Sequence, residues 1–291
     1  MECVMTVRTA DPRPRGADAR TLRIVLLGCA ALVMLVNVAP VLWGVATSVK
    51  PAEEIFTFPP TLLGGFTTEH YAQVLDGSFV RNLMNSLAYA MTATAVAVAI
   101  GAFAAYAFDR FRFPCRQMLF GVIVACVPLS MGAAVLVIPN YLYFATLGLL
   151  DTPVILPLLY LGYNLPMAVW ILKGAMEGIP VELDEAATID GASRLRTFAS
   201  VILPLCRPSM AAASLFVFIG AWNEFVAGSV MVNSSEYRPV QVAVYQFISA
   251  FGRQWGPLTA SAALALLPVL ILVTLFGRHL VAGMMRGAVK G

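Results

Sequence analysis

Charged side chains are scarce in this chain. Of its 291 residues, 12% are Asp, Glu, Lys or Arg and 59% are hydrophobic, whereas an ordinary soluble domain carries about 25% charged residues. A water-soluble fold of this size could not bury so much apolar surface. The composition therefore excludes a soluble globular protein and predicts a chain that lies in a membrane.

The few charges are spaced in blocks with long uncharged stretches between them. Uncharged stretches lie between Arg23 and Lys50, Arg81 and Asp109, Arg116 and Asp151, Asp151 and Lys173, and Arg253 and Arg278. A helix that crosses the hydrocarbon core needs about 20 apolar residues, so each stretch could span a bilayer. A sixth run, Pro208 to Val232, carries one acid, Glu224. We expect an all-α polytopic membrane protein with six transmembrane helices, near residues 24–45, 83–108, 118–139, 152–172, 209–232 and 258–277.

The positions of Lys and Arg predict the orientation, because these residues accumulate in cytoplasmic loops. With the N-terminus inside, fifteen of the nineteen fall in cytoplasmic segments, and Lys50, Arg81, Arg238 and Arg253 remain outside. Both termini are thus expected in the cytoplasm. We divide the chain into a disordered cytoplasmic tail (1–20), a transmembrane domain (21–280) and a cytoplasmic C-terminal tail (281–291).

Several chemical signatures are missing. None of the five cysteines falls in an external loop, and no CxxC or metal-ligand spacing occurs, so we expect neither a disulfide nor a metal site. The Gly-x-x-x-x-Gly-Lys-Ser/Thr phosphate loop and any nucleophile–base arrangement are also absent. The chain is therefore expected not to be an enzyme. His70 and His279 are expected to be surface residues.

The most polar internal segment is the predicted cytoplasmic loop 173–207. It holds five of the sixteen acidic residues. Pro180 can start a helix, and acids such as Asp184 just after it suit the positive end of the helix dipole. Gly191 can adopt the left-handed conformation that ends a helix. A second short helix is predicted over 193–202, closed by Pro204, so that the loop forms a helix, turn, helix against the membrane surface.

This loop resembles the Glu-Ala-Ala loop of ABC importer permeases. The family's pattern is Glu-Ala-Ala, three residues, Gly, nine residues, Ile-x-Leu-Pro. Here it appears as Glu185-Ala186-Ala187, Gly191 and Val201-x-Leu203-Pro204, with Val in place of Ile. In that family the loop docks into a separate cytoplasmic ATPase. The resemblance implies an ATPase-coupling role for Glu185, Ala186, Ala187, Asp190, Gly191, Leu203 and Pro204.

Other motifs are similar to the carbohydrate-uptake branch, in particular the smaller permease of maltose-type importers. These motifs are Trp222-Asn223-Glu224-Phe225, the pair Asn85-Ser86, and the tail Gly287 to Gly291. The resemblance covers essentially the whole chain after about residue 20. It implies the type I ABC importer permease fold, a bacterial inner-membrane location and a sugar or sugar-like solute. It also implies three partners: a homologous second permease, an extracytoplasmic solute-binding protein, and a cytoplasmic ATPase dimer that uses ATP and Mg, with no cofactor in this chain.

Two further groups of residues have candidate roles with open alternatives. An acid within a span costs roughly 2.5–3.5 kcal/mol and usually faces a bundle interior or a water-filled path, so Trp222, Asn223 and Glu224 are candidates to line the solute pathway. The alternative is that Glu224 pairs structurally with Asn223 or with the partner. In the external segment 233–254, the resemblance implies that Tyr237, Tyr245 and Phe251 contact the binding protein. An aromatic belt at the membrane boundary is the alternative.

Competing functions stay open at this point. An ABC permease for polyols, glycerol phosphodiesters or amino acids would share the coupling loop. An ion-coupled secondary carrier driven by Glu224 would often show two repeated halves, and the sequence contains no such repeat. A membrane enzyme would need clustered catalytic groups. The polar loop could also be an amphipathic linker lying on the membrane.

Overall fold

A computed structural model describes residues 16–59, 64–131, 134–249 and 252–288. The described chain is almost entirely helical, apart from a short antiparallel hairpin of β1 (Ile248–Ser249) and β2 (Gly252–Arg253). The predicted tail at 1–20 lies mostly outside these residues, as do the last three residues of the predicted C-terminal tail. The all-α fold class is confirmed.

Five helices of the described chain are long and apolar enough to cross a membrane. They are α1 (Gly16–Ser48), α3 (Phe79–Arg110), α6 (Ile155–Met176), α9 (Leu203–Trp222), which continues a helix from Arg194, and α12 (Trp255–Ala288). Four of the predicted spans fall on α1, α3, α6 and α12. These four long uncharged stretches thus form helices long enough to span a bilayer.

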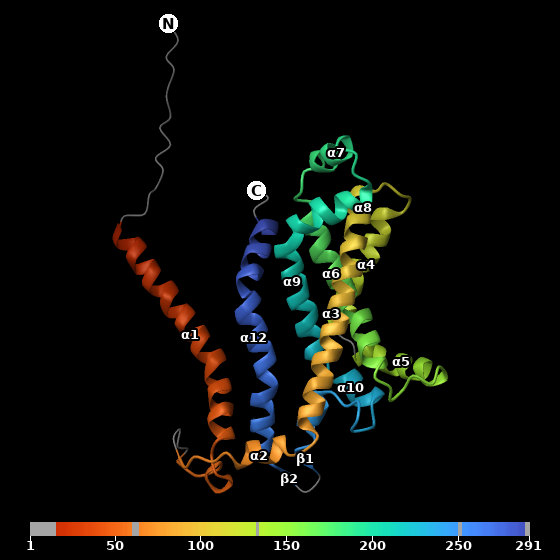
Figure 1. The fold of residues 1–291 in the computed structure, drawn as a ribbon. Helices are drawn as coiled ribbons and strands as arrows, with labels where there is room; N and C mark the ends of the chain where they lie inside the picture. Colours follow the sequence, from red (N-terminus) through yellow and green to blue (C-terminus); the bar gives the residue numbers. More distant parts are fainter. Residues whose placement is uncertain (1–15, 60–63, 132–133, 250–251, 289–291) are drawn as a thin grey trace.

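The connecting elements gather at the two ends of the helix bundle (Figure 1). The start of α1, the end of α12 and the short helices α7 (Glu182–Ile189) and α8 (Arg194–Thr197) lie at one end, which we name the hairpin end. The 3-10 helix η1 (Ala52–Glu54), α2 (Glu69–Leu75), the β hairpin and α10 (Val226–Met231) lie toward the opposite end. This division matches the two sides that the Lys and Arg pattern assigns.

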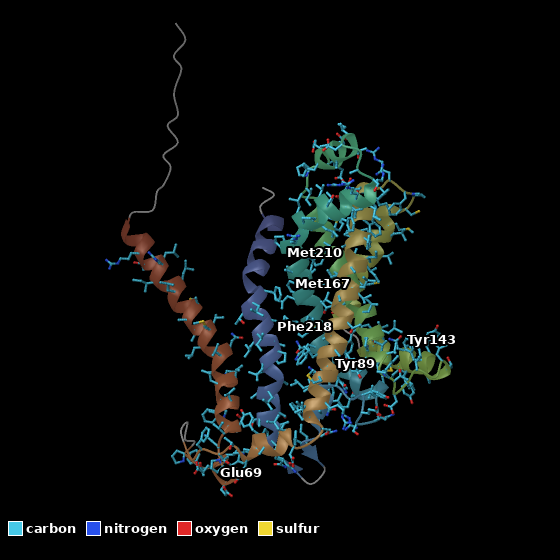
Figure 2. All side chains as sticks on the ribbon, in the orientation of Figure 1. Glu69, Tyr89, Tyr143, Met167, Met210 and Phe218 are labelled. Atoms are coloured by element: carbon cyan, nitrogen blue, oxygen red, sulfur yellow. The ribbon has the colours of Figure 1, made fainter. Side chains whose placement is uncertain are left out.

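Small residues let α3, α6 and α9 pack closely at the centre. A Cβ atom added to Gly101 of α3 would lie 3.1 Å from the Ala168 Cβ of α6. On α9, one added to Gly220 would lie 2.2 Å from Asn164 Oδ1 of α6. Helices in lipid associate through such close contact. Figure 2 shows Tyr89 of α3 and Phe218 of α9 in this packed part, where both are buried.

The third predicted span differs from the structure. A single helix over 118–139 is expected, but the chain forms α4 (Arg116–Met131) and α5 (Ala134–Thr146), and residues 132–133 are outside the described part. Pro128 lies within α4 and Pro139 within α5, and each proline removes one helical hydrogen bond. The uncharged run between Arg116 and Asp151 thus contains two shorter helices.

The fifth predicted span is interrupted as well. Instead of one helix over 209–232, α9 ends at Trp222 and α10 begins at Val226. The break coincides with Asn223 and Glu224, the one amide and the one acid of the run.

The edge helix α1 approaches α12 at the end opposite the hairpin and diverges from it toward the hairpin end (Figure 1), which leaves most of its apolar side chains uncovered. Met34 and Leu35 expose 67% and 65% of their surface. On the C-terminal helix, Leu270 and Leu275 are exposed in the same way. Such surfaces require lipid or another membrane-embedded chain against them.

Candidate functional site

The polar hairpin, residues 177–193, has the predicted helix and turn. Gly191 adopts the left-handed conformation with φ +80°. Its N–H donates to the Thr188 carbonyl at 3.0 Å, and the Ala192 N–H donates to the Ala187 carbonyl at 2.9 Å. This pair of bonds is the Schellman arrangement that closes a helix on a glycine. The predicted end of the first helix is confirmed.

The tip of the polar hairpin projects from the bundle (Figure 1). No residue of α7 is buried, and Ile189 exposes 87% of its surface. Glu185 is exposed, and within the described chain its carboxylate has no hydrogen bond or ion pair. Ala186 and Asp190 are also exposed, while Ala187 is half-buried. The helix thus offers a surface of small residues with exposed acids, Glu185 among them, and the exposed apolar side chain of Ile189.

Asp184, next to Glu185, faces the bundle instead. Its Oδ2 accepts a charge-assisted bond from Arg110 Nε at 2.8 Å, and its Oδ1 accepts from the Tyr106 hydroxyl at 3.2 Å. The same guanidinium donates to the Ile179 carbonyl at 2.8 Å. The last turn of α3 therefore holds the polar hairpin by its base and by its first helix.

The second arm of the loop corrects the prediction that Pro204 closes a short helix. α8 runs through the π-helical turn η2 (Phe198–Ile202) directly into α9, and the Leu203 N–H donates to the Phe198 carbonyl five residues back. Because Pro204 cannot donate to the carbonyl four residues before it, a wider turn at this point lets the helix continue. Leu203 and Pro204 thus lie in the first turn of α9, apart from the exposed tip around Glu185.

Trp222 is the last residue of α9, and Asn223 and Glu224 lie in the break before α10. The three side chains differ in environment. The Trp222 indole is 2% exposed and stacks on Phe218 with ring centroids 5.5 Å apart. Asn223 is exposed. The Glu224 Oε1 accepts the Ala227 N–H at 2.8 Å, which satisfies a free donor in the first turn of α10. This capping role was missed from sequence because the break itself was not predicted.

The segment that follows is fastened to α3 by the pair Asn85-Ser86. The Asn85 Nδ2 donates to the carbonyls of Glu236 and Arg238 at 2.7 and 3.2 Å, and the Ser86 Oγ accepts the Val240 N–H at 2.7 Å. These bonds satisfy backbone groups of an irregular segment. The motif therefore has a structural reason that sequence alone does not reveal.

The aromatic candidates of this segment are divided. Tyr237 is half-buried against the core. Tyr245, at the end of α11 (Val240–Tyr245), is 57% exposed, and its ring centroid lies 4.9 Å from that of Phe225. Phe251 lies outside the described residues. A surface aromatic ring thus stands close to the α9–α10 break.

Asp151, which the sequence did not single out, joins two segments at the opposite end. Its carboxylate accepts the backbone N–H groups of Ser234 at 2.9 Å and Asn233 at 3.2 Å, and its own N–H donates to the Met231 carbonyl at 3.0 Å. The Ser234 N–H bond, with further bonds from Ser234 and Asn233, holds the pKa of the Asp151 carboxyl below its ordinary value of 3.8. Its positive φ of 55° is compatible with Asp.

His70 is not a surface residue, which corrects the expectation. It is 7% exposed, and its Nε2 lies 2.9 Å from the Lys50 carbonyl oxygen. A Cβ atom added to Gly256 of α12 would lie 2.3 Å from the ring, so the imidazole occupies space that this glycine leaves free. The side chain of His279 lies outside the described set.

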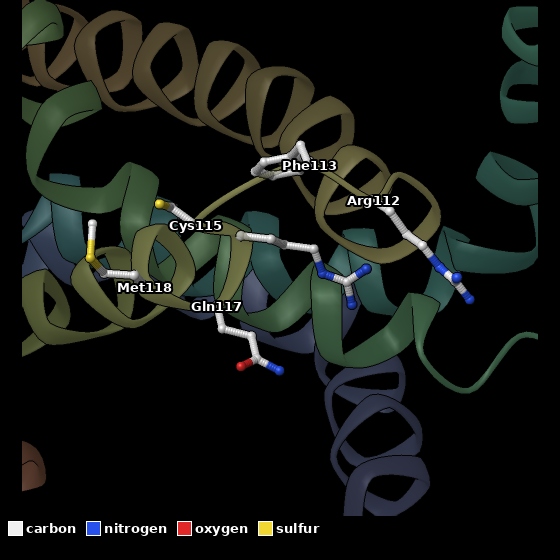
Figure 3. A pocket seen from close by; sticks show the side chains of 6 residues that line it. Arg112, Phe113, Cys115, Gln117 and Met118 are labelled. Carbon is white, nitrogen blue, oxygen red and sulfur yellow. The ribbon is translucent and has the colours of Figure 1, made fainter.

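A hollow of about 470 Å³ lies at the hairpin end, where the turn between α3 and α4 leaves the bundle. Its lining is formed by Arg112, Phe113, Cys115, Arg116, Gln117 and Met118. In Figure 3 the side chains of Arg112 and Gln117 extend in similar directions in the view and do not converge on a common centre. The described residues include no group of three or more His, Cys, Asp or Glu side chains that could hold a metal ion.

Comparisons with known proteins find a matching family and several similar proteins. A family model, described as binding-protein-dependent transport system inner membrane component, matches residues 61–286. The trehalose/maltose transport system permease protein MalG of Thermococcus litoralis is 34% identical over 281 residues, covering 92% of this chain and 97% of the relative. The trehalose transport system permease protein SugB of Mycobacterium tuberculosis is 34% identical over 259 residues, covering 87% and 92%.

The fold is that of solved ABC importers. A chain from the crystal structure of a bacterial ABC transporter involved in import of the acidic polysaccharide alginate superposes with a TM-score of 0.76 at 21% identity, covering 92% of this chain and 99% of that one. The type I importer permease fold is thereby confirmed. With its bundle of membrane-length helices, its projecting polar hairpin and a family match over most of its length, the chain belongs to the binding-protein-dependent transport system inner membrane component family.

Proposed function

We propose that this chain is one of two permease subunits of an ATP-driven, binding-protein-dependent sugar importer. The observation that carries the proposal is the polar hairpin, which projects from the bundle with an exposed glutamate at a spacing that matches the family's Glu-Ala-Ala loop. A sugar is the favoured solute because the relatives MalG and SugB are named for trehalose or maltose transport.

The polar hairpin is the proposed docking element for a separate ATPase. Ala186 and Ala187 allow a partner to approach the helix backbone, and Glu185 is free to bind a partner cation. Ile189, 87% exposed, supplies the apolar contact that a docked helix would bury. ATP and Mg would be bound by the ATPase dimer, so the hairpin end faces the cytoplasm and both termini lie on that side.

A second, homologous permease would complete the solute pathway. The helices α1 and α12 both have apolar faces that the rest of the chain leaves uncovered. One of these faces would pack against the membrane-embedded partner. In this arrangement Asn223 and Glu224 lie at the helix break, where non-helical backbone is tolerated only beside protein or a water-filled path. Trp222 is buried in the described conformation, so its contact with solute requires movement of α9.

The solute-binding protein would dock at the opposite end. Tyr245 offers an exposed ring beside a hollow of about 280 Å³ formed with Arg238, Asn233 and neighbouring residues. Tyr237 and Phe251 belong to the same proposed contact. Asn85 and Asp151 would hold this surface in shape through the backbone bonds described above.

Reconstitution tests the proposal directly. The chain is placed in lipid vesicles with its second permease, ATPase and binding protein, and uptake of labelled trehalose and maltose is measured. We expect uptake that requires ATP and the binding protein and that vanadate abolishes. Uptake driven by a proton or sodium gradient without the ATPase would instead establish a secondary carrier, and uptake of an amino acid in place of sugar would overturn the substrate class.

A further inference from the structure

The end of α3 contacts the polar hairpin and also the helical segment that follows it, α8 and η2. On the outgoing arm, Arg110 binds Asp184 and the Ile179 carbonyl, each at 2.8 Å. In the segment after the hairpin, the Phe198 ring of η2 lies 4.9 Å from the Tyr106 ring. The Arg194 guanidinium of α8 lies 5.1 Å from the ring centroid of Phe111, the residue that follows α3. A displacement of the hairpin together with this segment thus acts on the end of α3.

The ion pair at this contact is shielded from solvent. The side chains of Arg110 and Asp184 are 7% and 16% exposed, and Asp109 shares the same guanidinium at 2.5 Å. A buried charge that loses its partner is strongly unfavourable. The pair therefore resists separation far better than a surface ion pair, whose contribution is small.

Adjacent acids have opposite orientations. Glu185 is exposed and unpaired within the described chain, whereas Asp184 is half-buried and bonded to α3. Glu185 is therefore available to bind a partner, while Asp184 attaches the hairpin to the membrane domain.

We propose that Arg110 and Asp184 form the joint through which movement of the polar hairpin is transmitted to α3, with the Tyr106 hydroxyl as its second bond. The inference rests on the proposed function, because it assumes an ATPase that moves the hairpin. Both residues are positioning residues: they touch neither solute nor nucleotide, and their loss disconnects ATP hydrolysis from transport without removing the ATPase.

The test uses the assembled transporter in vesicles and compares Asp184→Asn, Arg110→Gln and the double variant with the parent. Three quantities are measured: co-purification of the ATPase, ATP hydrolysis and solute imported per ATP hydrolysed. We expect co-purification to be retained and solute imported per ATP to fall at least about fivefold, the lower range of allosteric coupling. The double variant should lose no more than either single variant, because both act through one contact.

Arg112→Gln is the matched control, since it removes an exposed guanidinium two residues after Arg110 and outside the polar hairpin, and it should leave all three quantities unchanged. Spin labels at Ile189→Cys and Arg112→Cys, in a background whose five native cysteines are replaced by serine, report on the joint without depending on transport. The distribution of distances between the two labels should broaden in Asp184→Asn. An unchanged solute-to-ATP ratio in Asp184→Asn, or loss of the ATPase from that variant, would overturn the inference. If the proposed function itself fails, the parent transporter shows no ATP-dependent uptake at all.

Discussion

The Ser86 hydroxyl accepts the Val240 backbone N–H at 2.7 Å, and this bond joins residues 154 positions apart. Val240 is fully buried, so no water can replace the acceptor. The bond fixes the start of α11 to the first half of α3 and thereby positions the segment that carries Tyr245.

Replacing this hydroxyl is expected to destabilise the protein measurably. Ser86→Ala leaves a buried N–H without a partner, at a cost of about 1–3 kcal/mol. Thermal unfolding of the detergent-solubilised protein should show a lower midpoint. Ser200→Ala is the control, because the Ser200 hydroxyl only bonds the carbonyl four residues back on an exposed helical surface. Equal midpoints for the two variants would contradict the anchoring role.

Gly191 is expected to tolerate little substitution. At φ +80° an alanine costs about 1–2 kcal/mol, although a Cβ atom there would meet no neighbour within 4 Å. Gly191→Ala should therefore fray the end of α7, detectable as faster hydrogen exchange in 187–192. Gly174→Ala, also in open space but inside α6, should leave exchange unchanged.

Two further substitutions of Gly191 distinguish a steric block of docking from strain in the backbone. Gly191→Trp should insert normally into the membrane yet fail to co-purify with the ATPase, because the indole would stand where the partner must approach. Gly191→Asn tolerates the left-handed conformation better and should retain the ATPase. Normal co-purification of the tryptophan variant would argue against docking at this turn.

Glu224 allows its capping role to be distinguished from a role for its charge. Glu224→Gln keeps an oxygen that can accept the Ala227 N–H, whereas Glu224→Ala removes it and should cost about 0.5–2 kcal/mol, as for other lost caps. We expect the alanine variant to unfold at lower temperature and the glutamine variant to match the parent. If the glutamine variant is stable but transports poorly, the charge itself acts in the solute pathway.

Asp151 predicts a specific acid sensitivity. Its folded-state pKa lies below the ordinary value of 3.8, so the ionised carboxylate contributes stability above that value, and the contribution disappears as the pH falls through the folded pKa. The parent should unfold at higher temperature than Asp151→Asn at pH 7. The difference should shrink once the pH drops below about 3.8. A difference that grows on acidification would rule out the bonds to Ser234 and Asn233 as its origin.

The membrane-length helices and the Gly191 turn were predictable because they follow from local composition and glycine geometry. The separation of α4 from α5 and the break at Asn223 were not predictable, since an apolar run records hydrophobicity but not where a helix ends. His70 was misassigned because its burial depends on a glycine 186 positions away. The pairing of Arg110 with Asp184 likewise depends on the path of the chain between them, so only the exposed tip of the site could be inferred in advance.

Helix α3 is continuous over 32 residues, about 48 Å at 1.5 Å per residue. Near one terminus it holds Asp184, and near the other it holds the backbone around Val240. Both contacts lie on one uninterrupted helix, so a change in the tilt of α3 would move the polar hairpin and the segment around Val240 together.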